Sequence, residues 1–204
     1  NQRSEQSVQL SLVKRNARRL LNLVNQLLDF RKMEENELKL KYSVADLILY
    51  MHEVSESFAD MAVRKSIDYS FHSIIPSLVV SFDQEKVERI LFNLLGNAFK
   101  FTLEGGSISL QVDEVCDDEH DNFVRVYISV RDTGIGIPKE AQTQIFESFF
   151  QYESDEKILN QGTGIGLSIV QAFVRMHDGE IHVNSDLDQG SVFSFYLRLQ
   201  RATY

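Results

Sequence analysis

The sequence predicts an α+β sandwich preceded by one long helix. Two observations predict this class. Apolar residues recur at helical spacing near the start of the chain, and the later helices and strands mix without the regular strand–helix–strand alternation of a doubly wound sheet. The 204 residues, 43% of them hydrophobic, suffice for one good core or two modest ones. We expect two units, a partial helical bundle at residues 1–36 and a globular domain at residues 37–204.

The composition excludes several classes of protein. Lys and Arg total 21 against 30 Asp and Glu, and the net charge of −9 predicts no direct nucleic-acid binding. Cys116 is the only cysteine, so no disulfide framework is available and a reducing compartment is indicated. No apolar run is long enough to span a bilayer, and the polar start is no signal peptide. The sequence indicates either a soluble protein or the cytosolic piece of a longer one.

The first helix carries a broad apolar stripe. Its apolar positions alternate spacings of three and four residues, as in a heptad seam, and Leu21 and Leu28 widen the stripe. A single helix of this kind is not stable alone, and no partner helix precedes it in this chain. We therefore expect self-association or a truncated N-terminus. The seam residues are Leu10, Val13, Ala17, Leu20, Val24 and Leu27.

The next segment, up to Phe101, alternates strands and helices. The stretch "LKLKY" predicts a strand, and Ser43 with Asp46 three residues later predicts a capping box for a helix that ends near Lys65. The stretches "IDYSFH" and "LVVSF" predict short strands. Asp83 is expected to cap a helix that ends near Phe101.

The remaining elements are mostly strands. "SISLQVDEV" and "FVRVYISVRD" predict a hairpin pair, and "EIHVNS" with "VFSFYLRL" predicts a closing hairpin. Between the two hairpins we expect a short helix from Pro138, an irregular polar stretch from Tyr152 to Gln161, and a helix from Gly164 to His177.

One helix has an unusual polar flank. Asn93, Asn97 and Lys100 lie at i, i+4 and i+7 within "EKVERILFNLLGNAFKF", so they share one side of the helix. Helix propensity does not explain two asparagines beside a lysine. The three residues either face solvent as ordinary polar residues or form a site in which two amide oxygens bind magnesium and the ammonium meets a phosphate oxygen.

The stretch "DTGIGIP" follows a predicted strand. Gly134 and Gly136 allow a close approach of the backbone to a ligand or a positive φ angle, and Asp132 is an acceptor suited to an exocyclic amine. An ordinary tight turn with an aspartate cap explains the same residues.

A second glycine-rich stretch, "GTGIGLSIV", leads into a helix. The spacing of Gly162, Gly164 and Gly166 fits neither a P-loop nor the dinucleotide-binding fingerprint. The remaining interpretation is a helix N-terminus whose free backbone N–H groups can bind phosphate.

The order of four motifs, "NLLGNAFKF", "DTGIGIP", "IFESFF" and "GTGIGLSIV", resembles the N, G1, F and G2 boxes of sensor histidine kinases. These kinases share a superfamily with type II topoisomerases, Hsp90 and mismatch-repair ATPases. The apolar seam resembles the second helix of the dimerisation and phosphotransfer domain of hybrid sensor kinases. The resemblance implies a mixed sheet covered on one face by three helices, with ATP under a flexible lid at residues 152–161. It also implies a cytoplasmic domain whose parent protein lies in the inner membrane.

The resemblance also implies roles for individual residues. Asn97, with Asn93 beside it, would hold Mg²⁺, and Lys100 would contact phosphate, which makes Asn97 and Lys100 the implied catalytic groups. Asp132 would accept a hydrogen bond from the adenine amino group. The other implied nucleotide-binding residues are Phe101, Gly134, Gly136 and Ile137 at the base, and Gly162, Thr163, Gly164, Ile165, Gly166 and Leu167 at the phosphates.

The chain departs from the family pattern in two places. Ser148 stands in the F box where many members have an arginine, and the histidine-containing H box is missing, because His52 lacks the usual continuation and follows the bundle helix. The resemblance thus implies a protein-histidine kinase that transfers the γ-phosphoryl group of Mg-ATP to a histidine absent from this sequence, so that the chain alone is not expected to autophosphorylate.

The implied setting is a two-component phosphorelay. The parent would be a homodimer through the N-terminal helix, and its partner would be a response regulator or a fused receiver domain. Two alternatives remain open. One is an ATPase clamp of the topoisomerase or Hsp90 type, with Glu85 or Glu88 as the base, and the other is a degenerate kinase that acts as a dimerising scaffold.

Overall fold

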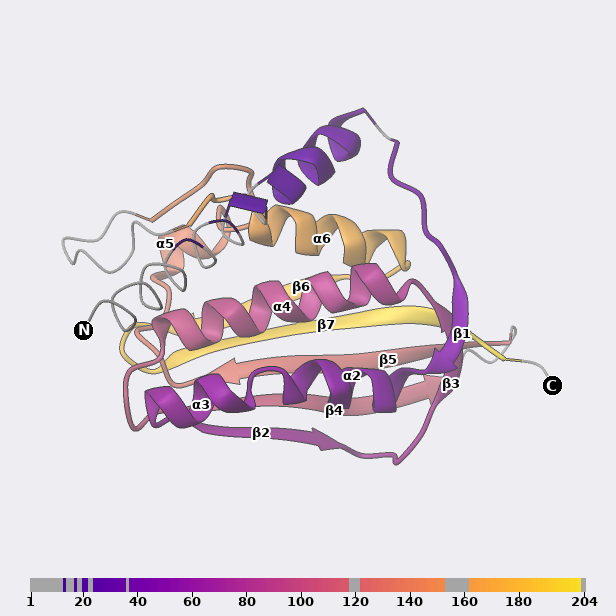
Figure 1. Cartoon of the computed structure of the whole chain (residues 1–204), viewed down its shortest axis with the longest axis horizontal. Helices are drawn as coiled ribbons and strands as arrows, with labels where there is room; N and C mark the ends of the chain where they lie inside the picture. Colours follow the sequence, from indigo (N-terminus) through magenta and orange to yellow (C-terminus); the bar gives the residue numbers. More distant parts are fainter. Residues whose placement is uncertain are drawn as a thin grey trace, which may run out of the picture.

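The computed structural model describes residues 24–35, 37–117, 122–152 and 162–202, together with Val13, Ala17, Leu20 and Leu21. Its main feature is a seven-stranded sheet with helices packed on one face (Figure 1). The strands are β1 (Ser43–Asp46), β2 (Asp68–Ser73), β3 (Val79–Phe82), β4 (Ser107–Asp117), β5 (Phe123–Asp132), β6 (Ile181–Asp186) and β7 (Gly190–Arg201). The helices are α2 (Leu47–Glu56), α3 (Ala59–Lys65), α4 (Gln84–Phe101), α5 (Lys139–Gln142) and α6 (Gly166–Met176), and residues 24–34 form a further helix.

The sheet is mixed, as the resemblance implied. Its strand order is β1-β3-β7-β5-β4-β2, and β6 pairs with β7 outside this path. Strands β2 and β4 are parallel, whereas the other described pairs are antiparallel. Both expected hairpins, β4 with β5 and β6 with β7, are confirmed.

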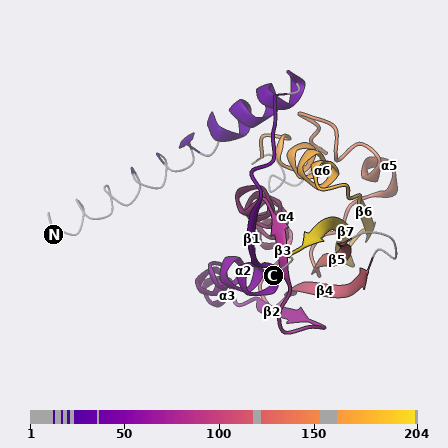
Figure 2. The same cartoon turned by 90° about the vertical axis from the view of Figure 1, so that its right-hand side faces the viewer.

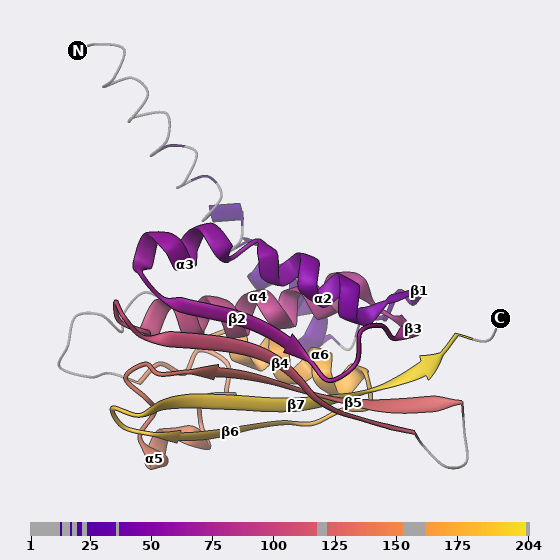
Figure 3. The ribbon, with the colours of Figure 1, turned by 90° about the horizontal axis from the view of Figure 1, so that it is seen from below.

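The α2–α3 pair, α4 and α6 cover one face of the sheet, and α5 lies beside β6 (Figures 2 and 3). The core lies between these layers. Val126 and Val130 of β5 and Leu95 of α4 are completely buried. Burial of such a side chain contributes about 1.5–3 kcal/mol, so this interface holds α4 firmly on the sheet.

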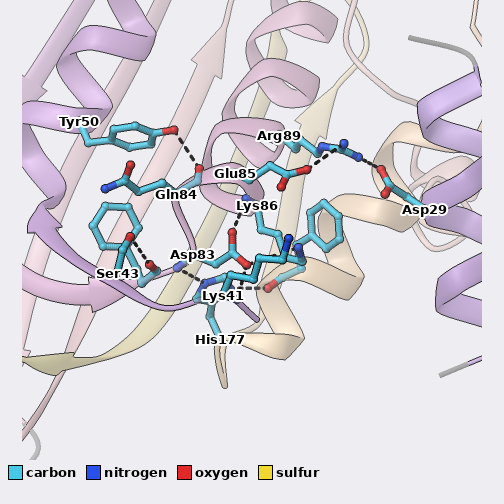
Figure 4. A network of polar contacts seen from close by, with 12 residues as sticks. Asp29, Lys41, Ser43, Tyr50, Asp83, Gln84, Glu85, Lys86, Arg89 and His177 are labelled. Carbon is cyan, nitrogen blue, oxygen red and sulfur yellow. Dashed lines mark hydrogen bonds and ion pairs between the residues drawn. The ribbon is translucent and has the colours of Figure 1, made fainter. Parts of the chain in front are cut away.

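Two expectations before α4 are wrong. The stretch "LKLKY" forms no strand, because the backbone N–H of Lys41 donates to the carboxylate of Asp83 (2.7 Å) rather than to a neighbouring strand (Figure 4). The alternation nevertheless reflects burial, since Leu38 and Leu40 are half-buried. The strand instead begins at Ser43, immediately after this stretch.

The expected helix from Ser43 to Lys65 is also divided. Asp46, not Ser43, caps it, because the Asp46 carboxylate accepts from the N–H groups of Ile48 (3.0 Å) and Leu49 (3.2 Å). The helix then breaks between α2 and α3, where the buried ring of Phe58 stacks on Phe99 at a centroid distance of 5.5 Å.

The helix at the centre of the site is confirmed. Asp83 caps α4 through the N–H of Lys86 (3.1 Å), and α4 ends at Phe101. The helix expected from Gly164 begins two residues later, at Gly166, because the Thr163 hydroxyl accepts from the N–H of Ile165 (3.3 Å) and holds a non-helical turn.

The N-terminal helix leaves its apolar stripe exposed. Exposed fractions run from 50% at Val24 and Leu28 to 65% at Val13. Leu10 lies outside the described residues. Within the described part of the chain, no helix combines the length and the apolar character needed to cross a membrane.

Candidate functional site

The polar flank of α4 lies beside the segment from Gly162 to Gly166. A Cβ atom added at Gly166 would lie 2.6 Å from Oδ1 of Asn93, and one added at Gly162 would lie 3.6 Å from Nζ of Lys100. Asn97 stands between Asn93 and Lys100 on the same helix. The segment therefore runs antiparallel to the flank, with no side chain between them at its two outer glycines.

The two asparagines offer oxygen atoms in different ways. Nδ2 of Asn93 donates to the carbonyl oxygen of Arg89 (2.8 Å), which leaves Oδ1 facing the start of α6 at Gly166. Asn97 is half-buried, and its side chain forms no hydrogen bond with any residue that the structure describes. An amide without a partner in this position is available to a ligand.

Lys100 is a half-buried cation. Its ammonium lies 4.5 Å from the centroid of the Phe101 ring, and burial lowers the pKa of the ammonium group. No carboxylate of the described residues lies within ion-pair distance of it. A ligand with negative charge would stabilise this ammonium.

Asp132 ends β5 and is almost completely buried, with 7% of its surface exposed. Burial raises the pKa of its carboxyl group, and hydrogen bonds from the N–H groups of Gly134 and Ser191 partly offset this effect. The bond from Gly134 to Oδ1 is 2.8 Å long. Of the two carboxylate oxygens, Oδ1 is therefore the one that the loop backbone holds.

The loop after Asp132 is attached to the end of α4. A Cβ atom at Gly134 would lie 2.6 Å from the carbonyl oxygen of Phe101, and the N–H of Ile135 donates to the same oxygen (3.3 Å). Gly136 has a positive φ of 72°, and a Cβ atom there would lie 2.0 Å from the carbonyl oxygen of Asp186. Both glycines of the "DTGIGIP" stretch are thus required by close backbone contacts.

The segment before α6 is held by neighbouring loops. Gly164 has a positive φ of 70°, and its carbonyl oxygen accepts from the N–H of Phe149 (2.9 Å). Ile165 is buried in the core. Leu167 is half-buried and packs against the same core. The expected lid lies mostly outside the described residues, which omit 153–161.

The N-terminal helix reaches the same region, which the sequence did not predict. Arg89 pairs with Asp29 of this helix and with Glu85 (3.1 Å) (Figure 4). The Thr163 hydroxyl donates to Oε1 of Gln26 (3.0 Å). The rings of Phe30 and Phe149 meet edge to face at 5.1 Å. For Gln26 and Asp29, the spacing of polar residues opposite the apolar stripe is the signal that could have indicated these contacts.

The residues present fit a magnesium-bound nucleotide. The described residues contain no group of three His, Cys, Asp or Glu side chains that could hold a metal ion. The available donors are instead the amide oxygens of Asn93 and Asn97, beside the ammonium of Lys100. Magnesium takes oxygen ligands and binds readily through one or two protein groups together with phosphates.

The comparison with protein families decides the classification. Residues 82–201, more than half of the chain, match the model described as "Histidine kinase-, DNA gyrase B-, and HSP90-like ATPase". The chain belongs to this ATPase family. The matched residues run from the end of β3 to β7 and include all four motif stretches.

Within this ATPase family, the chain is similar to several histidine kinases. The sensor histidine kinase TmoS of Ectopseudomonas mendocina is 40% identical over 188 residues, which cover 92% of this chain and 19% of TmoS. The full-length ShkA structure in complex with AMPPNP superposes with a TM-score of 0.75 at 30% identity, over 91% of this chain and 37% of ShkA. The histidine kinase ThkA in complex with the response regulator TrrA gives a TM-score of 0.63 at 25% identity, over 88% of this chain and 48% of that chain.

These similarities confirm the expected family, fold and catalytic ATP-binding domain. The chain spans a fifth or less of the length of the curated relatives it matches.

Proposed function

We propose that this ATPase-family chain binds Mg-ATP and presents its γ-phosphoryl group to a histidine outside the chain, as the catalytic domain of a sensor histidine kinase. The observation that carries the proposal is the polar flank of α4, where Oδ1 of Asn93 and the half-buried ammonium of Lys100 lie beside the outer glycines of the segment 162–166, with the unpartnered amide of Asn97 between them on the helix. The identity to TmoS supports the kinase branch of the family.

Each residue would have a distinct task. Asp132 would accept a hydrogen bond from the adenine amino group, and Phe101 and Ile137 would lie beside the base. Asn97 and Asn93 would hold magnesium, which when bound neutralises charge on the phosphates. Lys100 and the amide groups of residues 162–167 would bind the phosphate oxygens. Phosphoryl transfer depends mainly on such positioning and charge stabilisation.

The surroundings of the domain belong to the same proposal. Residues 1–36 would be part of a dimerisation and phosphotransfer domain, and residues 37–204 the catalytic domain. The exposed stripe at Val24, Leu27 and Leu28 supports pairing with a second copy. The partner would be a response regulator, as in the ThkA complex, or a fused receiver domain, and the parent protein would lie in a membrane.

Two measurements test the proposal. Calorimetry on this chain should show ATP binding that depends on magnesium. The parent protein, incubated with ATP radiolabelled at the γ position, should acquire an acid-labile label on histidine. Absence of label from a parent that binds ATP would contradict the kinase assignment, and absence of ATP binding by the folded chain would favour the scaffold alternative.

The clamp alternative receives no support from the acidic residues. Glu85 is paired with Arg89 and lies eight residues before Asn93, about 12 Å along the helix. Glu88 lies near Tyr50 of α2, whose pKa rises to about 12, chiefly through burial. Steady-state hydrolysis that is lost on changing either glutamate would reverse this conclusion.

A further inference from the structure

The hydroxyl of Ser185, a residue of β6, joins the β6–β7 hairpin to the "DTGIGIP" loop. Its oxygen accepts from the N–H of Ile137 (2.7 Å), donates to the carbonyl oxygen of Gly190 (2.7 Å) and lies 3.0 Å from Oγ of Ser191. The Ser185 side chain is nearly inaccessible, with 4% of its surface exposed. Neither the motifs nor the family resemblance pointed to this residue.

The direction of each bond follows from the capacity of a hydroxyl group. A hydroxyl has one hydrogen and two lone pairs. The Gly190 carbonyl can only accept, so it takes the hydrogen of Ser185, and the N–H of Ile137 takes one lone pair. The remaining lone pair then accepts from Ser191, so all three bonding positions of Ser185 are used.

These bonds fix the two ends of the loop relative to each other. Asp132 lies opposite Ser191 in the β5–β7 pair and accepts from its N–H, while Ile137 is bound to Ser185. The contact between Ser185 and Ser191 joins the two ends. Gln142 reinforces this link, because its amide donates to the carbonyl oxygens of Ile137 (2.8 Å) and Ser185 (2.7 Å).

We infer that Ser185 is a positioning residue for recognition of the adenine base. Its hydroxyl sets the place of Ile137 relative to the Asp132 carboxylate without touching the nucleotide. The inference rests on the proposed function, in which Asp132 binds the adenine amino group. Without the hydroxyl, the N–H of the partly buried Ile137 loses its partner, and the loop shifts to regain one.

The test compares Ser185→Ala with Ser55→Ala. Ser55 is a matched control, since it is 3% exposed and its hydroxyl bonds to Tyr69 (2.7 Å), on the α2 side of the fold. Calorimetry gives Kd for ADP and GDP, and hydrogen exchange on the nucleotide-free chain follows the Ile137 amide. Thermal unfolding of both variants checks that they remain folded.

Ser185→Ala should weaken ADP binding by about tenfold, narrow the ratio of GDP to ADP Kd values, and speed exchange at Ile137 by about tenfold or more. Ser55→Ala should leave all three unchanged. An unchanged ratio in Ser185→Ala overturns the inference, whether or not exchange at Ile137 speeds up. If the wild-type chain binds neither nucleotide, the proposed function itself fails, which is a separate result.

Discussion

The loop from Asp132 to Ile137 and the segment from Gly162 to Leu167 both rely on glycine, but neighbouring groups hold them in different ways. At Gly136 an added Cβ atom would lie 2.0 Å from a backbone oxygen, whereas at Gly162 the nearest atom, 3.6 Å away, is the end of the Lys100 side chain. Backbone contacts fix the first loop. In the second segment only a Cβ atom at Gly164 would meet backbone closely, 2.6 Å from the carbonyl carbon of Phe149, whereas Gly162 and Gly166 at its ends border the side chains of Lys100 and Asn93. In the proposed site, the loop Asp132–Ile137, which would bind the base (the base end), is therefore preformed. The segment Gly162–Leu167, which would bind the phosphates (the phosphate end), can adjust at Gly162 and Gly166.

This difference has a consequence for control of the site. Hydrogen bonds from the interior of the sheet hold the base end, whereas Gln26 and Phe30 of the N-terminal helix contact the phosphate end. A rigid loop suits selection of a flat base. If the segment binds phosphate as proposed, its contacts with the helix would couple phosphate binding to the position of that helix.

The largest expected effect is at the base end. Asp132→Asn should weaken ATP and adenosine alike by about 100-fold, because the amide presents hydrogen atoms to the adenine amino group in place of an acceptor. Calorimetry with ATP, adenosine and GTP measures the loss. An equal loss for ATP and GTP would mean that Asp132 does not select the base.

The same variant should unfold at a temperature no lower than that of the wild type. Burial raises the pKa of Asp132 in the folded chain, so its ionised form costs stability above that folded pKa, and the cost is relieved as the pH falls through it. The neutral amide of the variant has no charge to bury. A clear drop in the unfolding temperature would show that the carboxylate has a structural role.

Lys100→Met should weaken the binding of the phosphates and leave the binding of the base nearly unchanged. We expect ATP binding to weaken by about 30-fold and adenosine binding to change by less than about twofold, since a charge-assisted bond to phosphate contributes about 2 kcal/mol. Lys39→Met, at an exposed position before β1, serves as the control for loss of one positive charge. A similar loss for adenosine would place Lys100 away from the phosphates.

Gly166→Ala should weaken ATP by about tenfold, because the new methyl group would lie 2.6 Å from Oδ1 of Asn93 and displace that amide. Gly96→Ala is the matched control. A Cβ atom at Gly96 meets nothing within 4 Å, so this change should stabilise α4 by about 0.5–1 kcal/mol and leave Kd unchanged. Equal ATP affinities in the two variants would show that Asn93 does not contribute to ATP binding.

The smallest effect concerns His177, which anchors α4 and α6 away from both ends of the site. Its Nε2 accepts from the N–H of Asp83 (3.4 Å) and its Nδ1 lies 2.8 Å from the carbonyl oxygen of Phe173, so the buried ring is neutral. Burial lowers the pKa of His177 below its ordinary value of 6.5, although the nearby Asp83 partly opposes this.

The contribution of His177 to stability is therefore complete above pH 6.5 and declines as the pH falls below it, because the unfolded chain then binds the extra proton. Denaturant unfolding between pH 5 and 8 should show this slope, and His177→Gln should flatten it. His182→Gln, at an exposed position of β6, is the control. Equal slopes in the wild type and His177→Gln would contradict the neutral buried ring.

Much of the fold could be predicted from local patterns. Asp83, the 3.6-residue periodicity of α4 and the alternation in β4, β5 and β7 act within one element, so the sequence alone reveals them. The strand expected at "LKLKY" failed for the opposite reason, since the distant Asp83 takes the N–H of Lys41. Asp46 rather than Ser43 caps α2 because its carboxylate also accepts from Leu78, which no local pattern could reveal.

Of the candidate site, the sequence could predict the placement of Asn93, Asn97 and Lys100 on one flank of α4, because helical spacing alone determines it. Ser185, Gln142 and Asp29 could not be found in this way. Each acts through a contact between elements far apart in the sequence, and none belongs to a motif.

A crystal structure of the chain with magnesium and AMPPNP tests most directly whether one nucleotide spans both ends of the site. We expect the adenine amino group within hydrogen-bond distance of Asp132, and the phosphates between the flank Asn93–Lys100 and residues 162–166. A nucleotide bound elsewhere, or none at a saturating concentration, would contradict it.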